Sequence, residues 1–307
     1  MLDVDKLATL RSVLACGSFS GAGAALSLTQ PAVSRQIALL ERQVGTQLVR
    51  RTRQGVHPTE AGRLLVEHAD AILGRIAFAE AQLAELTGVR RGHVRLGSFF
   101  SALGQLSTEL AVLLEERHPE LFRSQADVIQ DQLVDRRTAF QRLAAGELDV
   151  AIVFEHAFEP DPAPSDIEIV SLYADAPRLL VPAGHPLARA ASVTPEDFRD
   201  ATWVRAHNGS AARLVDHVLA RSRLRPQLQL AGHGDEPVEA QAFVAAGRGV
   251  TVAHALNVLI SHERVAAVPL EGGAPVRHIE AAIMRDQRAP LPRAVVDALR
   301  ELGRRRG

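Results

Sequence analysis

The sequence contains very little cysteine and few aromatic residues, and both shortages narrow the possible classes of protein. Its 307 residues include one cysteine, Cys16, one tryptophan and one tyrosine. A single cysteine excludes an internal disulfide and a cysteine-rich metal site, and its position in the first predicted helix indicates packing. Aromatic residues make up 4% of the chain, against 47% hydrophobic and 23% charged residues. This composition is typical of a soluble globular protein with two or three domains.

Long hydrophobic runs are also missing, so the sequence predicts no membrane-spanning helix. Asp3 and Asp5 stand near the start and lead directly into an amphipathic pattern. The basic start, apolar run and cleavage site of an export signal are absent there. We therefore expect a cytoplasmic protein.

The sequence lacks the motifs of several enzyme and cofactor-binding classes. Its twelve histidines are scattered, and His262-Glu263 lacks the second histidine of a zinc motif. Gly247-Arg248-Gly249 lacks the third glycine of a dinucleotide-binding loop and precedes a strand instead of following one. Neither a phosphate-binding loop ending in lysine nor the nucleophile turn of an α/β hydrolase is present. We predict no metal site, no cofactor and no catalytic residue.

Net charge is close to zero, with 35 basic and 36 acidic residues, but its distribution is uneven. Residues 1–92 carry eleven Lys or Arg against eight Asp or Glu, whereas the rest of the chain carries 24 against 28. Six arginines and only two glutamates lie from Gln30 to Arg63. A protein that binds nucleic acid along its whole length would be basic throughout, so we expect only the N-terminal end to contact DNA.

The basic segment from Ser18 to Val56 predicts two short helices, a tight turn and an arginine-rich hairpin. The second helix begins near Thr29, whose hydroxyl is suited to capping, with Pro31 in its first turn. The apolar positions of this helix form one buried stripe: Val33, Ile37, Leu40 and Val44. The opposite side is polar and cationic: Ser34, Arg35, Ala38 and Arg42. A small helical subdomain with solvated arginines would show the same pattern.

The polar side has the chemistry to read duplex DNA. Gln30, Ser34 and Arg35 lie in the first turns, where a helix entering the major groove brings side chains to base edges. Ser18 and Ser20 open the preceding helix. Hairpin residues Arg50, Arg51 and Arg53 are suited to phosphates or an adjacent minor groove. The DNA-binding candidates are therefore Ser18, Ser20, Thr29, Gln30, Pro31, Ser34, Arg35, Arg50, Arg51 and Arg53.

These residues resemble the LysR-type transcriptional regulators. The resemblance rests on Gly17-Ser18-Phe19-Ser20, Leu28-Thr29-Gln30-Pro31-Ala32-Val33-Ser34-Arg35-Gln36-Ile37, Leu40-Glu41, Val44-Gly45 and Thr59-Glu60-Ala61-Gly62. It implies an all-α winged helix-turn-helix at residues 1–58, with Gln30, Ser34 and Arg35 at base-contacting positions and the three hairpin arginines on the wing. Gly23 departs from the family pattern. It interrupts an alanine-rich helix, where glycine costs about 1 kcal/mol relative to alanine.

A long linker helix is expected at residues 59–88, since the stretch from Thr59 to Thr87 has no proline and its length would reach about 40 Å at 1.5 Å per residue. Its apolar residues repeat at intervals of four and three, which is the spacing of a coiled-coil seam. That seam could pack against its own chain, but its length favours a partner chain and therefore a homodimer or a dimer of dimers. The seam residues are Leu65, Ala69, Ile72, Ile76, Ala79, Leu83 and Leu86.

Beyond Arg91, short apolar strands alternate with helices, which predicts two α/β lobes with parallel sheets. Expected strands cover residues 94–98, 126–129, 150–154, 178–181, 203–204, 228–231, 250–253 and 278–284, and expected helices cover 102–117, 133–145, 210–221, 236–246 and 293–302. The resemblance implies a two-lobed effector domain at 93–302, similar to a type 2 periplasmic binding protein. Lobe 1 would comprise 93–167 and 273–302, and lobe 2 would comprise 168–272.

Ligands in such folds sit beyond the carboxyl ends of strands, often at helix N-termini. We therefore expect a small-molecule effector, a carboxylate or an aromatic compound, to bind between the lobes. The candidate residues follow predicted strands or begin predicted helices: Ser98, Phe99, Phe100, Ser101, Gln130, Asp131, Phe154, Glu155, Asn208, Gly209 and Ser210. Ser before a helix is often only a cap.

The combined pattern predicts a sequence-specific transcriptional regulator controlled by an effector. Its predicted partners are double-stranded DNA, the effector, a second copy of the chain and RNA polymerase, but no membrane. The alternative is a solute-binding or catalytic α/β domain with an accessory helical module, which fold alone would permit. The effector, the operator and the direction of regulation do not follow from the sequence.

Overall fold

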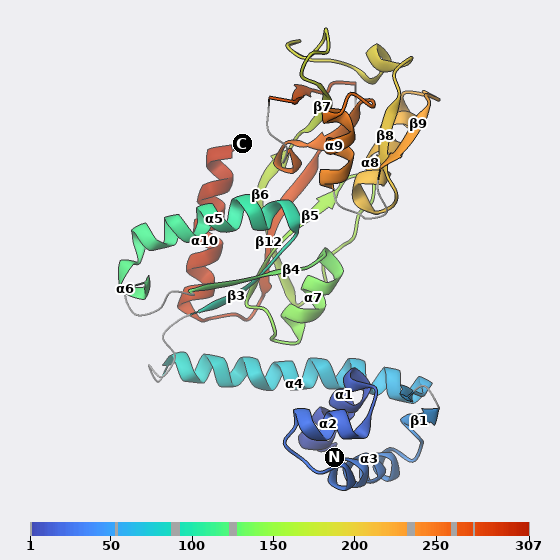
Figure 1. Cartoon of the computed structure of the whole chain (residues 1–307). Helices are drawn as coiled ribbons and strands as arrows, with labels where there is room; N and C mark the ends of the chain where they lie inside the picture. Colours follow the sequence, from blue (N-terminus) through green and yellow to red (C-terminus); the bar gives the residue numbers. More distant parts are fainter. Residues whose placement is uncertain are drawn as a thin grey trace.

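The computed structural model describes residues 2–52, 55–86, 93–122, 128–231, 237–258, 263–272 and 274–306. A small N-terminal domain is followed by one long helix and then by two α/β lobes (Figure 1). The elements of the first part are α1 (Val4–Cys16), α2 (Phe19–Ala25), α3 (Gln30–Val44), β1 (Val49–Thr52), β2 (Gly55–Pro58) and α4 (Glu60–Leu86). Strands β1 and β2 pair antiparallel and form the predicted hairpin, in which Arg53 lies outside the described residues.

Helix α3 forms because its ends are capped and one side is apolar. The Thr29 hydroxyl accepts a hydrogen bond from the Ala32 amide at 3.4 Å, and Gly45 ends the helix with φ of 77°. Val33, Ile37 and Leu40 are buried in the domain core, as predicted. Val44 is 36% exposed, so its predicted burial is wrong: it is the last helical residue, where the chain turns away from the core.

Gly23 is required by the turn between α2 and α3. A Cβ atom at this position would lie 2.7 Å from the carbonyl oxygen of Leu28, and the Leu28 amide donates to the Gly23 carbonyl at 2.8 Å. Glycine lowers the helix propensity at this position, but its missing side chain allows the turn to approach α2 closely. Cys16 is exposed at the end of α1, which corrects its predicted packing.

The first half of α4 belongs to the core of the DNA-binding domain. Ala69 is fully buried there, so its predicted exposure to a partner chain is wrong, and Leu65 is partly buried against the same cluster. The short helices need this extra apolar surface to close a core. Exposed residues continue along the helix: Ile72, Ile76, Ala79 and Leu83, together with Leu64. Residues 87 and 88 and the side chain of Leu86 lie outside the described part.

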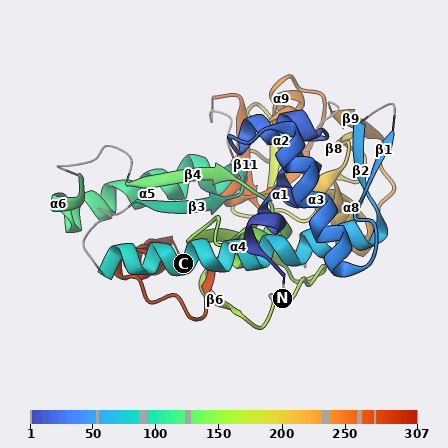
Figure 2. The ribbon, with the colours of Figure 1, turned by 90° about the horizontal axis from the view of Figure 1, so that it is seen from below.

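Helix α4 also touches lobe 1. Figure 2 shows α1, α2 and α3 gathered near one end of α4. At Gly74 the helix meets the backbone of Ala145 so closely that a Cβ atom would overlap its carbonyl group. The next residue, Arg75, forms an ion pair with Asp286 of lobe 1. The linker helix therefore contacts both the DNA-binding domain and the effector domain of its own chain.

Lobe 1 is built on a five-stranded sheet in the order β4-β3-β5-β12-β6. Its elements are β3 (Val94–Ser98), α5 (Phe100–Arg117), α6 (Pro119–Phe122), β4 (Ile129–Leu133), α7 (Arg136–Ala144), β5 (Val150–His156), β6 (Ile167–Asp175), β12 (Arg277–Met284) and α10 (Pro290–Arg306). Helices α5 and α10 contribute to the larger hydrophobic cluster, and α7 contributes to the other cluster. The C-terminal segment thus completes lobe 1.

The lobe 1 sheet differs from the prediction in three respects. It is mixed, because β12 runs antiparallel to β5 and β6. The strand expected at 126–129 occupies Ile129–Leu133, so α7 begins only at Arg136, and residues 126–127 lie outside the described part. Strand β6 pairs with β12 in this sheet, so the lobe boundary expected at residue 167 lies after Asp175.

Lobe 2 contains β7 (Pro177–Pro182), β8 (Trp203–Ala206), α8 (Gly209–Arg221), β9 (Leu228–Ala231), α9 (Pro237–Ala245), β10 (Thr251–His254) and β11 (Val265–Pro269), with short 3-10 helices at Pro195–Phe198 and Ala255–Asn257. Strands β10, β7 and β11 are antiparallel, again unlike the predicted parallel sheet, whereas β8 and β9 are parallel. Across the described ranges, no helix combines the length and apolar character needed to span a membrane.

Candidate nucleic-acid interface and interlobe cleft

The outward side of α3 is polar and cationic, as its sequence predicts. Gln30, Arg35 and Arg42 are exposed, and Ser34 is partly exposed beside them. These side chains lie opposite the buried stripe of the same helix. A helix with this division presents amide, hydroxyl and guanidinium groups on one accessible surface, which suits hydrogen bonding to base edges.

The hairpin and the recognition helix meet through Arg51. Its guanidinium donates to the Ser34 hydroxyl at 3.2 Å and lies over the Phe19 ring, 4.2 Å from the ring centre. Arg51 is therefore drawn toward α3 in the free protein, while its neighbour Arg50 is exposed. A phosphate contact by Arg51 would require it to leave Ser34 or to bridge both groups.

Two hydroxyls predicted at this interface cap helices. Ser18 accepts from the Gly21 amide at 3.0 Å, and Thr29 caps α3. Each hydroxyl still has a hydrogen available to donate to a phosphate. Ser20 and Pro31 are exposed next to them. The described DNA-binding candidates on α2, α3 and β1 are exposed or partly exposed, and Arg51 links the hairpin to α3 through Ser34.

A cleft of about 960 Å³ lies between the two lobes. Phe99, Phe100, Ser101, Phe154, Glu155, Gly209 and Ser210 are the predicted effector residues that line it. Lobe 1 supplies the first five from the carboxyl ends of β3 and β5 and the start of α5, and lobe 2 supplies the others from the start of α8. Asp135 and Thr138, at the N-terminal end of α7, line the same cleft.

Four predicted effector residues are not among the cleft lining. Ser98 is fully buried, with its hydroxyl 3.2 Å from that of Ser107. Gln130 and Asp131 lie inside β4 because this strand starts later than predicted. Burial raises the pKa of Asp131, against the lowering effect of the Ser107 and Ser98 hydroxyls. Asn208 precedes α8 with an exposed side chain.

A buried ion pair joins the two segments that connect the lobes. Arg277 begins β12 and Asp175 ends β6, and the two side chains are each 2% exposed. Their nearest charged atoms are 2.8 Å apart, and Arg277 also donates to the Ser101 hydroxyl at 3.3 Å. The guanidinium lies 5.1 Å from the ring centres of Phe99 and Phe154. These contacts hold the ends of β6 and β12 in register at the base of the cleft. We call the region around Asp175 and Arg277, where the chain passes between the lobes, the hinge.

Two histidines lie beside this ion pair and are held in the neutral form. Burial, followed by the charge of Arg277, lowers the pKa of His254 to about 2. Burial and the charges of Arg277, Arg213 and His217 lower the pKa of His156 to about 4. The His254 Nε2 atom lies 3.0 Å from the Pro275 carbonyl oxygen, whereas His156 Nδ1 is buried without a hydrogen-bond partner.

Sequence reasoning missed this hinge cluster. The scattered histidines match no local motif, and Arg277 stands one residue before the strand predicted at 278–284. The sequence does show two opposite charges next to apolar stretches: Arg277 stands before one such stretch and Asp175 stands at the end of another. The pairing itself links positions 102 residues apart, so no local pattern reveals it.

Residues 4–63 match the family model described as "Bacterial regulatory helix-turn-helix protein, lysR family", and residues 87–304 match "LysR substrate binding domain". The chain belongs to the LysR family. LysR-type proteins are DNA-binding transcriptional regulators with an effector-binding domain, and this chain has both parts. The predicted family, fold class and general function are therefore confirmed.

Relatives and solved structures agree with this assignment. A "Probable RuBisCO transcriptional regulator" of Cyanidium caldarium is 27% identical over 233 residues, covering 74% of this chain and 71% of that relative. Full-length OxyR from Pseudomonas aeruginosa has a TM-score of 0.69 at 20% identity, covering 98% of this LysR-type chain and 95% of OxyR. CbnR in complex with its target DNA has a TM-score of 0.66 at 19% identity, with 98% and 99% coverage. These two structures share its fold.

Proposed function

We propose that this LysR-type regulator reads DNA in the major groove through the exposed side of α3. The observation that carries the proposal is the division of this helix, with Arg35 and Gln30 exposed while Val33 and Ile37 are buried. Arg35 and Gln30 lie in the first two turns, where a recognition helix contacts bases. Arg50, Arg51 and Arg53 would contact the phosphate backbone or the neighbouring minor groove.

Binding to the region upstream of its own gene tests this function. Fluorescence anisotropy should detect tight binding to a cognate fragment and much weaker binding to an unrelated fragment. Arg35→Ala should weaken cognate binding by about 1–3 kcal/mol, whereas Arg50→Ala should weaken both fragments alike and flatten the salt dependence. Arg199→Ala removes an exposed arginine of lobe 2 and serves as the control. Failure of the wild type to bind any genomic fragment at low salt would refute the proposal.

We further propose that two copies act together and that the interlobe cleft binds a small-molecule effector. A dimer places two recognition helices on successive half-sites, which a single domain cannot do. The exposed apolar residues of α4 supply a surface for that contact, and the hinge strands allow the lobes to shift around a ligand. Because its target is the chromosome, we propose that the protein works in the cytoplasm.

A further inference from the structure

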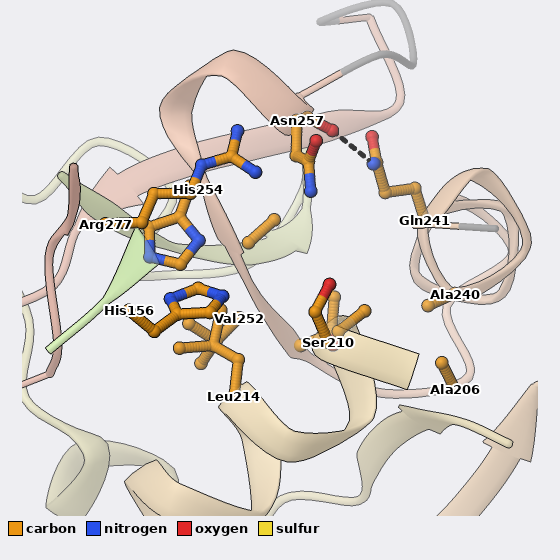
Figure 3. Close-up of a pocket in the computed structure, with 13 residues that line it drawn as sticks. His156, Ala206, Ser210, Leu214, Ala240, Gln241, Val252, His254, Asn257 and Arg277 are labelled. Atoms are coloured by element: carbon orange, nitrogen blue, oxygen red, sulfur yellow. Dashed lines mark hydrogen bonds between the residues drawn. The ribbon is translucent and has the colours of Figure 1, made fainter. Parts of the chain in front are cut away.

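The hinge holds a second, smaller cavity of about 20 Å³ next to the interlobe cleft (Figure 3). His156, Ser210, Asn257 and Arg277 line both spaces, so the small cavity is a recess of the larger one. Its volume accommodates an atom group of about the size of a water molecule. A ligand whose body lies in the cleft could therefore insert one oxygen atom of its head group here.

The recess is bordered by the N-terminal end of a helix without a side-chain cap. Helix α8 has 13 residues, and the side chain of its preceding residue, Asn208, makes no capping hydrogen bond. The first amides of a helix lack intrahelical partners and attract negative charge. Ser210 and Ala211, in this first turn, line the recess.

A buried and unpartnered imidazole lies at the same recess. His156 is 5% exposed and its Nδ1 atom has no hydrogen-bond partner. Figure 3 shows its ring beside that of His254, with Ser210 across the recess. A buried polar atom without a partner is costly, so a ligand that bonds to it gains affinity.

The charges around the recess favour an anion. The described residues that line it include Arg277 and two histidines but no carboxylate. Asp175 already pairs with Arg277, and Glu159 pairs with Arg213 at 2.7 Å. The wider cleft is lined by both signs of charge, with the carboxylates Asp135, Glu155, Glu159 and Asp161 and the arginines Arg136, Arg137, Arg213 and Arg277. Glu239 of α9 is not part of the recess lining.

We propose that the effector is an organic carboxylate whose head group binds between His156, Arg277 and the first amides of α8. This inference rests on the proposed effector function of the cleft. The body of the ligand would lie in the larger space, where Phe99 and Phe154 provide an apolar wall. A carboxylate bridges the lobes because His156 and α8 belong to opposite sides of the hinge.

Binding of such an anion should involve a proton. His156 is neutral in the empty site, facing Arg277 of β12, His254 of β10, and Arg213 and His217 of α8. A carboxylate beside the ring would raise the pKa of His156 and favour its charged form. Binding should therefore strengthen as the pH falls from 8 to 6 and should be accompanied by proton uptake.

The test uses phenylacetate, acetate, phenylacetamide and inorganic phosphate with the full chain. Isothermal titration calorimetry should show saturable binding of phenylacetate and competition by acetate. Binding should be at least about tenfold weaker for phenylacetamide, which lacks the negative charge that charge-assisted bonds need, and for phosphate, which is bulkier than a carboxylate. Ser210→Asp would place a resident carboxylate at the recess and should abolish binding, whereas the matched Ser210→Asn should retain it. His156→Asn should remove proton uptake, measured in two buffers of different ionisation enthalpy.

Equal binding of phenylacetate and phenylacetamide, preferential binding of phosphate, unchanged binding by Ser210→Asp, or no carboxylate binding would each overturn the inference. The DNA-binding assay distinguishes a failure of the carboxylate inference from a failure of the proposed function. If Ser210→Asp and the wild type both bind the cognate fragment, a failed carboxylate titration rejects the ligand class alone. Loss of DNA binding by the wild type would instead reject the function.

Discussion

At the scale of single residues, the hinge depends on a charge pair that is almost completely removed from water. Asp175 accepts from Arg277 at 2.8 Å and from the Leu256 amide at 3.2 Å, so its two oxygens hold both the start of β12 and the short 3-10 helix that follows β10. Burial lowers the pKa of Arg277, and the adjacent carboxylate of Asp175 opposes that effect. The two groups are tolerated in the interior only together.

Replacing one partner of this pair should therefore destabilise the folded protein strongly. Asp175→Asn is expected to lower the free energy of unfolding by about 3–5 kcal/mol, since it leaves a buried arginine without its counter-charge. Denaturant unfolding followed by the fluorescence of Trp203, the single tryptophan, measures this. Asp216→Asn breaks the exposed pair with Arg205 and should cost less than about 1 kcal/mol. Equal losses in the two variants would contradict the assignment.

The buried histidines make the free energy of unfolding depend on pH. Both are neutral when folded, with pKa values of about 4 for His156 and about 2 for His254, against 6.5 for an unperturbed histidine. Below pH 6.5 the unfolded chain binds more protons, so the free energy of unfolding should fall between pH 6.5 and 4, by up to about 1.4 kcal/mol per pH unit for each histidine. His254→Asn should reduce this slope.

The control for that experiment is His278→Asn, which replaces an exposed histidine one residue beyond Arg277. Its slope should match the wild type. If His254→Asn leaves the pH dependence of the free energy of unfolding unchanged, His254 is not neutral in the folded protein and the assignment is wrong.

At the scale of elements, helix α7 connects the cleft to the linker helix. Its N-terminal end is capped by Asp135, which lines the cleft and accepts from the Thr138 amide at 2.8 Å. Beyond its C-terminal end, Ala145 lies against Gly74 of α4. The same turn carries Glu147, whose carboxylate lies 4.0 Å from Arg11 of α1. A shift of α7 would thus act on the linker and the DNA-binding domain.

Gly74 decides how closely these elements approach. In an isolated helix, Gly74→Ala would stabilise α4 by about 1 kcal/mol. Here the new methyl group would overlap the Ala145 carbonyl, so we expect α4 and lobe 1 to separate and the melting temperature to fall. The matched control is Gly104→Ala in α5, where a Cβ atom meets nothing within 4 Å and the melting temperature should stay equal or rise. A more stable Gly74→Ala variant would disprove the contact.

At the scale of the whole molecule, α4 has two apolar surfaces with different roles. One packs Ala69 and Leu65 into the DNA-binding domain. The other leaves Ile72 and Ile76 38% and 37% exposed, and Leu83 61% exposed. Three large aliphatic side chains on one long helix are typical of a surface that a second chain covers.

Charge placed on that surface should separate the copies. Ile76→Lys is expected to raise the dimer dissociation constant by at least about tenfold, because a lysine would be buried without a partner. Light scattering after gel filtration measures the mass, and DNA affinity should fall in parallel. Glu67→Lys changes an exposed residue of α4 and provides the control. An unchanged mass for Ile76→Lys would exclude this side of α4 as the interface.

Local patterns in the sequence were sufficient for the features that depend on local physics. The Thr29 cap, the Gly45 stop and the spacing of Val33, Ile37 and Leu40 specify α3, because helix ends and amphipathic sides are set by neighbours within a few positions. The same reasoning located most later helices and strands.

Tertiary structure decided what depends on distant partners. Strand β6 joins the first sheet by pairing with β12, and that pairing brings Asp175 beside Arg277. Ala69 has the spacing of a dimer seam, but the core of its own chain covers it completely, and the same core covers part of Leu65. Periodicity shows that a surface is apolar, whereas only the folded chain determines which surface meets it.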